Sequence, residues 1–129
     1  MILSYHNKNA LSGEEYESAS EYGRNYASMA RQLLRDSNYS LSVAELASKI
    51  GVSANYLGKF FYRDKEETLK HYIARKRIER AEMFLANGMP PTEVAQVIGY
   101  TNYSAFYSAF FNKHQMSPSK YLKMHHSKN

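Results

Sequence analysis

Two short stretches of this sequence, residues 53–63 and 102–113, carry polar side chains at the spacing of a helix surface. In the first stretch, Asn55 is suited to pair with an adenine edge, and Lys59 to donate to guanine O6 and N7 or to a phosphate. The second stretch offers mainly serine and tyrosine hydroxyls, which suit phosphate oxygens and contact with thymine methyl groups. These residue types predict contact with nucleic acid, with more hydrogen-bonded base readout by the first stretch.

The candidate contact residues are those left after the side chains expected in the core are removed. The side chains expected in the core are Leu57, Phe60, Phe61 and part of Tyr56 in the first stretch. In the second stretch they are Ala105, Phe106, Ala109 and Phe110. The remaining residues are Ser53, Asn55, Gly58, Lys59, Tyr62 and Arg63 in the first stretch, and Asn102, Tyr103, Ser104, Tyr107, Ser108, Phe111 and Lys113 in the second. Gly58 reads no base but lets the helix approach closely. For each side chain the alternative is a solvated helix face.

The elements that would position these residues occur twice. Residues 45–53 read ELASKIGVS and residues 93–101 read EVAQVIGYT. The offset between the copies is 48 residues before the glycine and 49 after the turn, so the second copy carries one extra residue there. A short helix, a tight turn at glycine and a second helix form the helix-turn-helix unit. Two such units predict a chain that binds two successive stretches of a DNA major groove.

Capping and turn residues predict an all-α chain of about seven helices. Ser42 and Glu45 form a capping box before the first repeat, Gly51 ends its first helix, and Ser53 caps the second. No alternating run rich in β-branched residues predicts a strand. The helices are expected near residues 13–36, 43–50, 54–63, 69–86, 92–98, 102–114 and 117–124.

The longest regular segment after residue 40, residues 69–86, is predicted to be a linker helix between the two units. Thr68 is its expected cap, and Asn87-Gly88 followed by two prolines ends it. Ile78, Ala81 and Leu85 recur at spacings of three and four, and this face is expected to pack against both units. The predicted organisation is a lead-in and N-terminal helix over 1–36, a first unit over 37–68, the linker helix over 69–87, and a second unit with a C-terminal tail over 88–129.

The positive charge of the chain is unevenly distributed. Residues 1–40 hold four basic and five acidic side chains, whereas residues 41–129 hold thirteen basic and seven acidic ones. The basic excess therefore accompanies the repeats, as expected for a polyanion partner. The alternative interpretation of the charge alone, which it favours less, is a merely soluble basic domain.

Several classes of protein are excluded by composition. Without cysteine the chain forms neither disulfides nor a thiolate zinc site. His125 and His126 lie in a polar tail with no nearby carboxylate to complete a metal site, so no metal or cofactor is expected. No apolar run reaches the roughly 18 residues needed to span a bilayer, and no signal peptide is evident, so a cytoplasmic protein without membrane contact is expected. The sequence contains no nucleophile elbow, phosphate loop or pair of catalytic carboxylates, so an enzyme is not expected.

An ordered set of residues between positions 29 and 121 carries a more specific signal. The set is Ser42, Glu45-Leu46-Ala47, Gly51-Val52-Ser53, Tyr56-Leu57, Phe61, Tyr72, Arg77-Ile78-Glu79-Arg80-Ala81, Leu85, Ile98-Gly99-Tyr100, Phe106, Phe110, Ser117-Pro118 and Tyr121. This order and spacing resemble the DNA-binding region of the AraC/XylS family of bacterial transcription regulators. The resemblance implies two helix-turn-helix units on one face of the duplex. It places the base-reading positions at Asn55, Gly58 and Lys59, and at Tyr103, Ser104, Tyr107 and Ser108.

The sequence departs from the family pattern at three positions. Glu66 and Gln115 stand where the family usually has a glycine after each recognition helix. A non-glycine residue there either adopts a left-handed conformation, at a cost of about 1 kcal/mol, or reshapes the turn. Tyr100 replaces the usual phenylalanine before the second recognition helix, which is a mild change.

The sequence as a whole predicts sequence-specific binding of double-stranded DNA and regulation of bacterial transcription. RNA polymerase is a further candidate partner. The alternative is a protein-interaction module that contacts RNA polymerase or another regulator and has weak DNA affinity. Family members often carry a sensory domain, but residues 1–36 predict at most one helix, so neither a sensory domain nor a small-molecule effector site is expected in this chain.

Overall fold

The computed structural model describes the backbone of residues 13–126 and the side chains of residues 25–63 and 66–126; the lead-in predicted over residues 1–12 lies outside the described residues. Within the described part, the chain forms seven helices and no strand, so the all-α prediction is confirmed. The helices are α1 (Gly13–Asp36), α2 (Val43–Ile50), α3 (Ala54–Lys65), α4 (Leu69–Ala86), α5 (Pro91–Val97), α6 (Tyr103–His114) and α7 (Pro118–His126).

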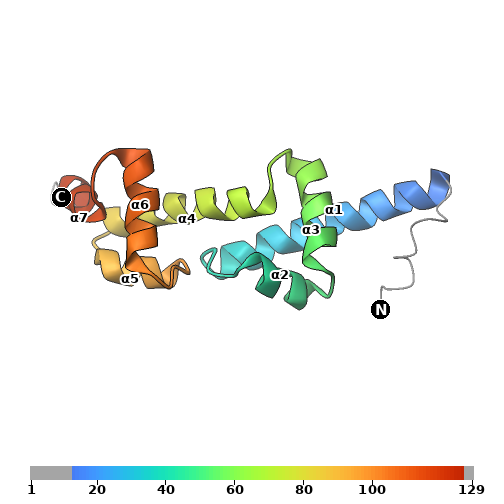
Figure 1. Ribbon diagram of the computed structural model, residues 1–129, viewed down its shortest axis with the longest axis horizontal. Helices are drawn as coiled ribbons and strands as arrows, with labels where there is room; N and C mark the ends of the chain where they lie inside the picture. Colours follow the sequence, from blue (N-terminus) through green and yellow to red (C-terminus); the bar gives the residue numbers. More distant parts are fainter. Residues whose placement is uncertain (1–12, 127–129) are drawn as a thin grey trace.

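The molecule is elongated, with α4 running between two groups of helices (Figure 1). The first hydrophobic cluster is formed by α1, α2, α3 and the first turns of α4, where Leu69, Tyr72 and Ile73 are buried. The second is formed by the later turns of α4 with α5 and α6, and residues of α7 pack against it. Each group therefore has a core of its own, and α4 contributes to both.

The expectation that one face of α4 packs against both groups is wrong. Ile78, Ala81 and Leu85 are buried in the second cluster alone. A helix rises 1.5 Å per residue, so Leu69 and Leu85 lie about 24 Å apart along the axis. With 3.6 residues per turn, Leu69, Tyr72 and Ile73 lie on the side of α4 opposite to Ile78, Ala81 and Leu85. The two cores therefore use different faces as well as different turns of the helix.

The turn that leads into α3 forms as its sequence predicts. Ser42 accepts a hydrogen bond from the Glu45 amide, while the Glu45 carboxylate accepts one from the Ser42 amide at 2.9 Å, which completes the capping box. Gly51 adopts a left-handed conformation with φ of 94°. Ser53 then accepts a hydrogen bond from the Tyr56 amide at 3.0 Å and starts α3. These contacts span three residues or fewer and depend on local sequence alone.

Helices α3 and α6 both end in a left-handed residue that is not glycine. Glu66 and Gln115 each have φ of 57°, and their amides donate to Tyr62 and Phe111 carbonyls at 2.6 and 2.7 Å. The turn is thus kept without glycine, at a cost of about 1 kcal/mol for each residue.

Several helix boundaries differ by one or two residues from those expected: α3 ends at Lys65, α5 ends at Val97, α6 begins at Tyr103, and α7 begins at Pro118. Helix α5 begins at Pro91 rather than Thr92, because a proline at the first helical position loses no intrahelical hydrogen bond. Helix α7 extends to His126, so His125 and His126 belong to a helix rather than to a polar tail. The His125 ring stacks on Tyr121 with centroids 4.0 Å apart, and His126 Nδ1 lies 3.3 Å from the Ala86 carbonyl oxygen. These contacts with α7 and α4 hold the last turn.

Candidate nucleic-acid interface

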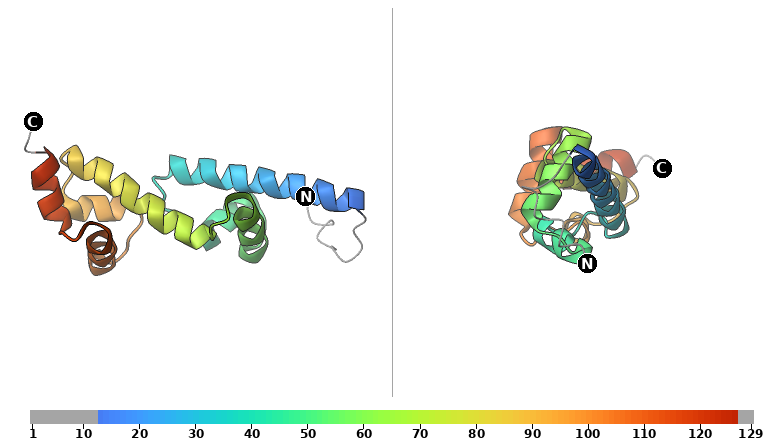
Figure 2. Two further views of the ribbon diagram at one scale, coloured as in Figure 1. Left: turned by 90° about the horizontal axis from the view of Figure 1, so that it is seen from above. Right: turned by 90° about the vertical axis from the view of Figure 1, so that its right-hand side faces the viewer.

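Helices α3 and α6 both run across the long axis of the molecule (Figure 1). Seen from above, both lie on the side of the molecule away from α1 (Figure 2). Each is the second helix of its repeat and follows a glycine turn. The two sets of candidate contact residues are therefore carried by the same side of one molecule.

On α3 the exposed candidate residues form one face. Asn55, Lys59 and Tyr62 are exposed, and steps of four and seven residues bring them to nearly the same side of a helix with 3.6 residues per turn. The Tyr62 side chain is 52% exposed, whereas Leu57 and Phe61 on the opposite side are fully buried. The Asn55 amide, which both donates and accepts hydrogen bonds, thus shares an exposed surface with the Lys59 ammonium and the Tyr62 phenol.

The other candidates near α3 are Ser53 and Arg63, which contact other groups of the protein, and Gly58. The Ser53 hydroxyl is engaged as the cap of α3, and the Arg63 guanidinium lies 5.6 Å from the Phe60 ring centroid. A β-carbon at Gly58 would meet nothing within 4 Å, so close packing inside the protein does not require glycine there.

On α6 the exposed face is aromatic and hydroxyl-rich. Ser104 and Ser108 are exposed, and Tyr103, Tyr107 and Phe111 are 37–39% exposed. The three rings follow one another along the helix, with centroid separations of 6.4 Å and 6.0 Å. Burial raises the pKa of Tyr103 above its usual range. The Tyr103 hydroxyl, like that of an ordinary tyrosine, is protonated at neutral pH and is able to donate to an anionic oxygen.

Two α6 candidates have partners inside the protein. The Asn102 side-chain oxygen accepts a hydrogen bond from the Ala105 amide at 3.2 Å and caps α6. The Lys113 ammonium forms a 2.8 Å ion pair with Glu82 of α4. Lys113 follows Ser104 by nine residues, or two and a half turns, and so lies on the opposite side of the helix. It is not brought together with the serine and tyrosine face.

The expectation that Ala105 faces the core is wrong, because its side chain is exposed. The equivalent residue of the first repeat, Tyr56, is only 8% exposed and its ring packs against Tyr26 of α1, at 5.8 Å between centroids. Helix α1 packs closely on α3, whereas none of the helices between residues 13 and 126 covers the side chain of Ala105. Sequence reasoning also missed the exposed Asn112, although the offset of 49 pairs it with Arg63.

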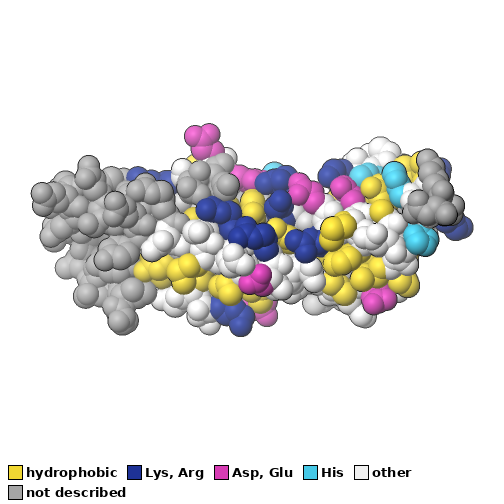
Figure 3. Space-filling model, turned by 180° about the vertical axis from the view of Figure 1, so that it is seen from behind, with side chains coloured by type: hydrophobic (Ala, Val, Ile, Leu, Met, Phe, Trp, Pro, Cys, Tyr) yellow, Lys and Arg dark blue, Asp and Glu magenta, His cyan; other side chains and the backbone are white. Residues whose placement is uncertain are grey.

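Part of the basic excess lies away from α3 and α6. Lysine and arginine side chains gather over the middle of the face seen from behind (Figure 3). Lys76 and Arg80 lie 5.9 and 5.1 Å from the Tyr39 ring centroid, and the Arg80 guanidinium donates to Asn38 at 2.7 Å. Net charge alone therefore does not locate the interface.

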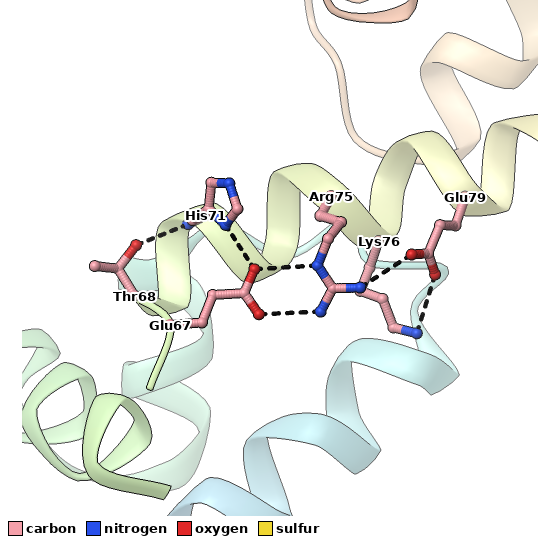
Figure 4. A network of polar contacts seen from close by, with 6 residues as sticks. All are labelled: Glu67, Thr68, His71, Arg75, Lys76 and Glu79. Carbon is pink, nitrogen blue, oxygen red and sulfur yellow. Dashed lines mark hydrogen bonds and ion pairs between the residues drawn. The ribbon is translucent and has the colours of Figure 1, made fainter. Parts of the chain in front are cut away.

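The start of α4 is held by a network of charged side chains (Figure 4). Glu67 accepts two hydrogen bonds from the Arg75 guanidinium, at 3.1 and 3.0 Å, and lies 2.6 Å from His71 Nδ1. Arg75 and Lys76 both pair with Glu79, at 3.0 and 3.2 Å. The hydrogen bonds from Arg75 lower the pKa of Glu67 from 4.5 to about 2.

This shift predicts an acid-dependent loss of stability. The folded protein favours ionised Glu67, so the contribution is complete above about pH 4.5 and is lost as the pH falls toward 2. Because Arg75 and His71 are solvent-exposed, Glu67→Gln should lower the free energy of unfolding at pH 7 by about 1 kcal/mol or less. Urea denaturation at a series of pH values should show the two proteins converging between pH 4.5 and 2. A difference that stays constant with pH would contradict the assignment.

None of the helices between residues 13 and 126 is long and apolar enough to cross a membrane. Among the described residues, no group of three or more histidine, cysteine or acidic side chains is arranged to hold a metal ion.

A family model described as a helix-turn-helix domain matches residues 46–124. The Msm operon regulatory protein of Streptococcus mutans is 34% identical over 85 residues, which are 65% of this chain and 31% of that protein. The melibiose operon regulatory protein of Escherichia coli is 29% identical over 119 residues, which are 90% of this chain and 39% of that protein. The chain thus spans about a third of the length of these relatives.

Solved structures share the fold. The C-terminal domain of AraT, a response regulator from Geobacillus stearothermophilus, superimposes with a TM-score of 0.67 at 25% identity, covering 77% of this chain and 84% of that chain. A transcriptional regulator from Chromobacterium violaceum, described as containing an AraC-type DNA-binding domain, superimposes with a TM-score of 0.65 at 18% identity, covering 84% and 99% of the two chains. The family match over most of the chain and the shared all-helical fold agree, and the chain belongs to the AraC/XylS family of transcription regulators, whose DNA-binding region it contains.

Proposed function

We propose that this chain binds double-stranded DNA sequence-specifically, with α3 and α6 in two successive segments of the major groove, and thereby regulates bacterial transcription. The observation that carries the proposal is the pair of exposed, capped helices on one side of the molecule, each the second helix of a repeated unit. Membership in a family of transcription regulators confirms that the chain is not an enzyme.

In this proposal the units over 37–68 and 88–129 each contribute one recognition helix, and α4 links them. Asn55 pairs with an adenine edge and Lys59 donates to guanine O6 and N7. On α6, the Ser104, Ser108 and tyrosine hydroxyls donate to phosphates, and the exposed Phe111 ring contacts thymine methyl groups. The half-sites are then about one helical turn, or roughly 10 base pairs, apart.

The two half-sites should differ in how strongly their bases are specified. Each bidentate contact discriminates between bases by about 1–3 kcal/mol, whereas phosphate contacts carry no sequence information directly. Selection of bound duplexes from a random pool should therefore yield a well-defined half-site for α3 and a degenerate, A·T-leaning one for α6. Two equally sharp half-sites, or information confined to the α6 side, would contradict this reading. Recovery of no enriched sequence would remove the proposal of specific binding altogether.

Replacing Lys59 with alanine should weaken binding to the selected site by about 1–3 kcal/mol, with a smaller loss on random DNA, because a base contact is lost. Lys70→Ala is the matched control, since it removes the same charge from an exposed position of α4. It should lower affinity for both duplexes equally or not at all. Fluorescence anisotropy with the two duplexes measures both effects. Equal losses with Lys59→Ala would make Lys59 a phosphate contact.

The alternative, a protein-interaction module with weak DNA affinity, has some support from the cations around Tyr39, which lie away from α3 and α6. RNA polymerase is the candidate partner for such a surface. Salt dependence separates the two functions, because each neutralised phosphate contributes a slope of about −0.9 in log affinity against log salt. A shallow slope on the selected site would favour the protein-interaction module.

A further inference from the structure

The two groups of helices touch at a seam beside α4. The turn before α6 meets the loop before α2, where a β-carbon at Gly99 would lie 2.7 Å from both the Cα and the carbonyl oxygen of Ser40. Gly99 also has φ of 98°, which a side chain would disfavour. The backbone of one repeat therefore rests directly on the entry to the other.

Arg77 of α4 lies in this seam and binds the first repeat. Its Nε donates to the Tyr39 carbonyl oxygen at 2.7 Å, and one terminal nitrogen lies 3.3 and 3.5 Å from the Ser40 and Leu41 carbonyl oxygens. These three carbonyls immediately precede Ser42, the cap of α2. A single guanidinium thus holds the backbone that leads into the first helix-turn-helix unit.

The same guanidinium also contacts the second repeat. Its carbon lies 5.3 Å from the Tyr100 ring centroid, a cation–π distance. The Tyr100 ring in turn lies 5.7 Å from the ring of Phe106, which is fully buried in the core of α6. A continuous path of contacts runs from the α2 entry through Arg77 and Tyr100 to the second recognition helix.

Arginine is chemically suited to this position and lysine is not. The planar guanidinium donates along its edge to several carbonyls while its face stacks on an aromatic ring. The contacts compensate for burial, which lowers the pKa of Arg77 from its usual value. Arg80, three residues later, makes side-chain contacts with the first unit alone: its guanidinium donates to Asn38 and lies over the Tyr39 ring.

The relative placement of two recognition helices matters because DNA is helical, so a change in the spacing of two half-sites also rotates one relative to the other. One inserted base pair moves a half-site by about 3.4 Å and rotates it by about 34°. Because α4 is packed into both cores, the two units are able to bend relative to each other only at the middle of α4, between Ile73 and Ile78, where Arg77 lies. A second connection across the seam removes that freedom.

We propose that Arg77 is a positioning residue that sets the relative orientation of α3 and α6, so that the protein reads the spacing between its half-sites as well as their sequence. The proposal rests on the proposed DNA-binding function for its second part. The orientation of the two units is testable without DNA.

The first experiment measures orientation. The chain has no cysteine, so Ser48→Cys and Gln96→Cys introduce one spin label on α2 and one on α5, both at exposed positions. Pulsed electron paramagnetic resonance should give a narrow distance distribution in the otherwise wild-type protein and a clearly broader one with Arg77→Met. Arg80→Met is the matched control and should leave the width unchanged. Equal widths with and without Arg77 would overturn the proposal.

The second experiment measures spacing on duplexes selected by the wild type. One inserted or deleted base pair between the half-sites should lower wild-type affinity about tenfold or more, a loss of the size expected for a poorly matched site. With Arg77→Met the penalty should shrink to a few-fold, and Arg77→Lys should restore it only in part. A full penalty in Arg77→Met would overturn the spacing claim. Should Arg77→Met fail to fold, Tyr100→Leu removes the stacked ring and leaves the loop hydrogen bonds, with the same broadening and the same loss of spacing preference expected.

The two experiments distinguish failure of the proposed DNA-binding function from failure of the proposed role of Arg77. Absence of any selected DNA site would overturn the proposed function, while the spin-label distances would still decide whether Arg77 orients the units. A lower melting temperature without broadening would mean that Arg77 merely stabilises the fold, and the proposal would be wrong.

Discussion

Replacing Ala81 with aspartate should unfold the second group of helices. Ala81 is 0% exposed and lies between Ile78 and Leu85 in the second hydrophobic cluster. A carboxylate there would be buried without a partner, at a cost of about 3–5 kcal/mol. That loss is a large part of the stability of a domain of this size. Thermal melting followed by circular dichroism should show a markedly lower transition or none.

The exposed Ala74 provides the matched control on the same helix. Ala74→Asp should change the free energy of unfolding by less than about 0.5 kcal/mol. Because Ala81 contacts only the second cluster, hydrogen exchange in Ala81→Asp should show lost protection in α5 and α6 before α2 and α3. Melting indistinguishable from wild type would show that this face of α4 is not buried in solution.

Replacing Phe106 with alanine should cost about 3–5 kcal/mol, since a large side chain is removed from a packed core. Phe106 is fully buried, and its ring contacts those of Tyr100, Tyr103 and Phe110 at 5.7–5.9 Å between centroids. Chemical denaturation should show a lower midpoint with an unchanged slope.

Phe111 is the control for Phe106, because it lies on the same helix and is 39% exposed. Phe111→Ala should cost less than about 1 kcal/mol of stability. It should nevertheless weaken binding to the selected duplex, because its ring lies on the proposed DNA-facing side of α6. Equal destabilisation by the two alanine variants would mean that the buried and exposed faces of α6 are wrongly assigned.

Local features of the fold were predictable from the sequence. The capping box at Ser42 and Glu45, the serine cap of α3 and the threonine cap of α4 all form as expected. Each of these features depends on contacts between residues at most four apart, so the chain segment itself contains the information.

The candidate interface was predictable to the same extent and for the same reason. The 3.6-residue period separates Asn55, Lys59 and Tyr62 from the buried side of α3, as the structure shows. The period alone misplaced Ala105, because its exposure depends on whether another helix covers that side. Removing only the expected core residues also left Lys113 among the candidates, although the period places it opposite Ser104 and Glu82 of α4 pairs with it from 31 positions earlier in the chain.

The amino-acid sequence by itself determined the helices, their caps, the repeated unit and the polar faces, because hydrogen bonding within a turn and the helical period are local properties. Only the tertiary structure decided how α4 divides its length between two cores, and that Arg77 joins the loop before α2 to Tyr100. Both depend on the packing of segments that are distant in the chain. A pattern read along one helix shows that a face is apolar or a side chain long, but not which distant backbone or ring it meets.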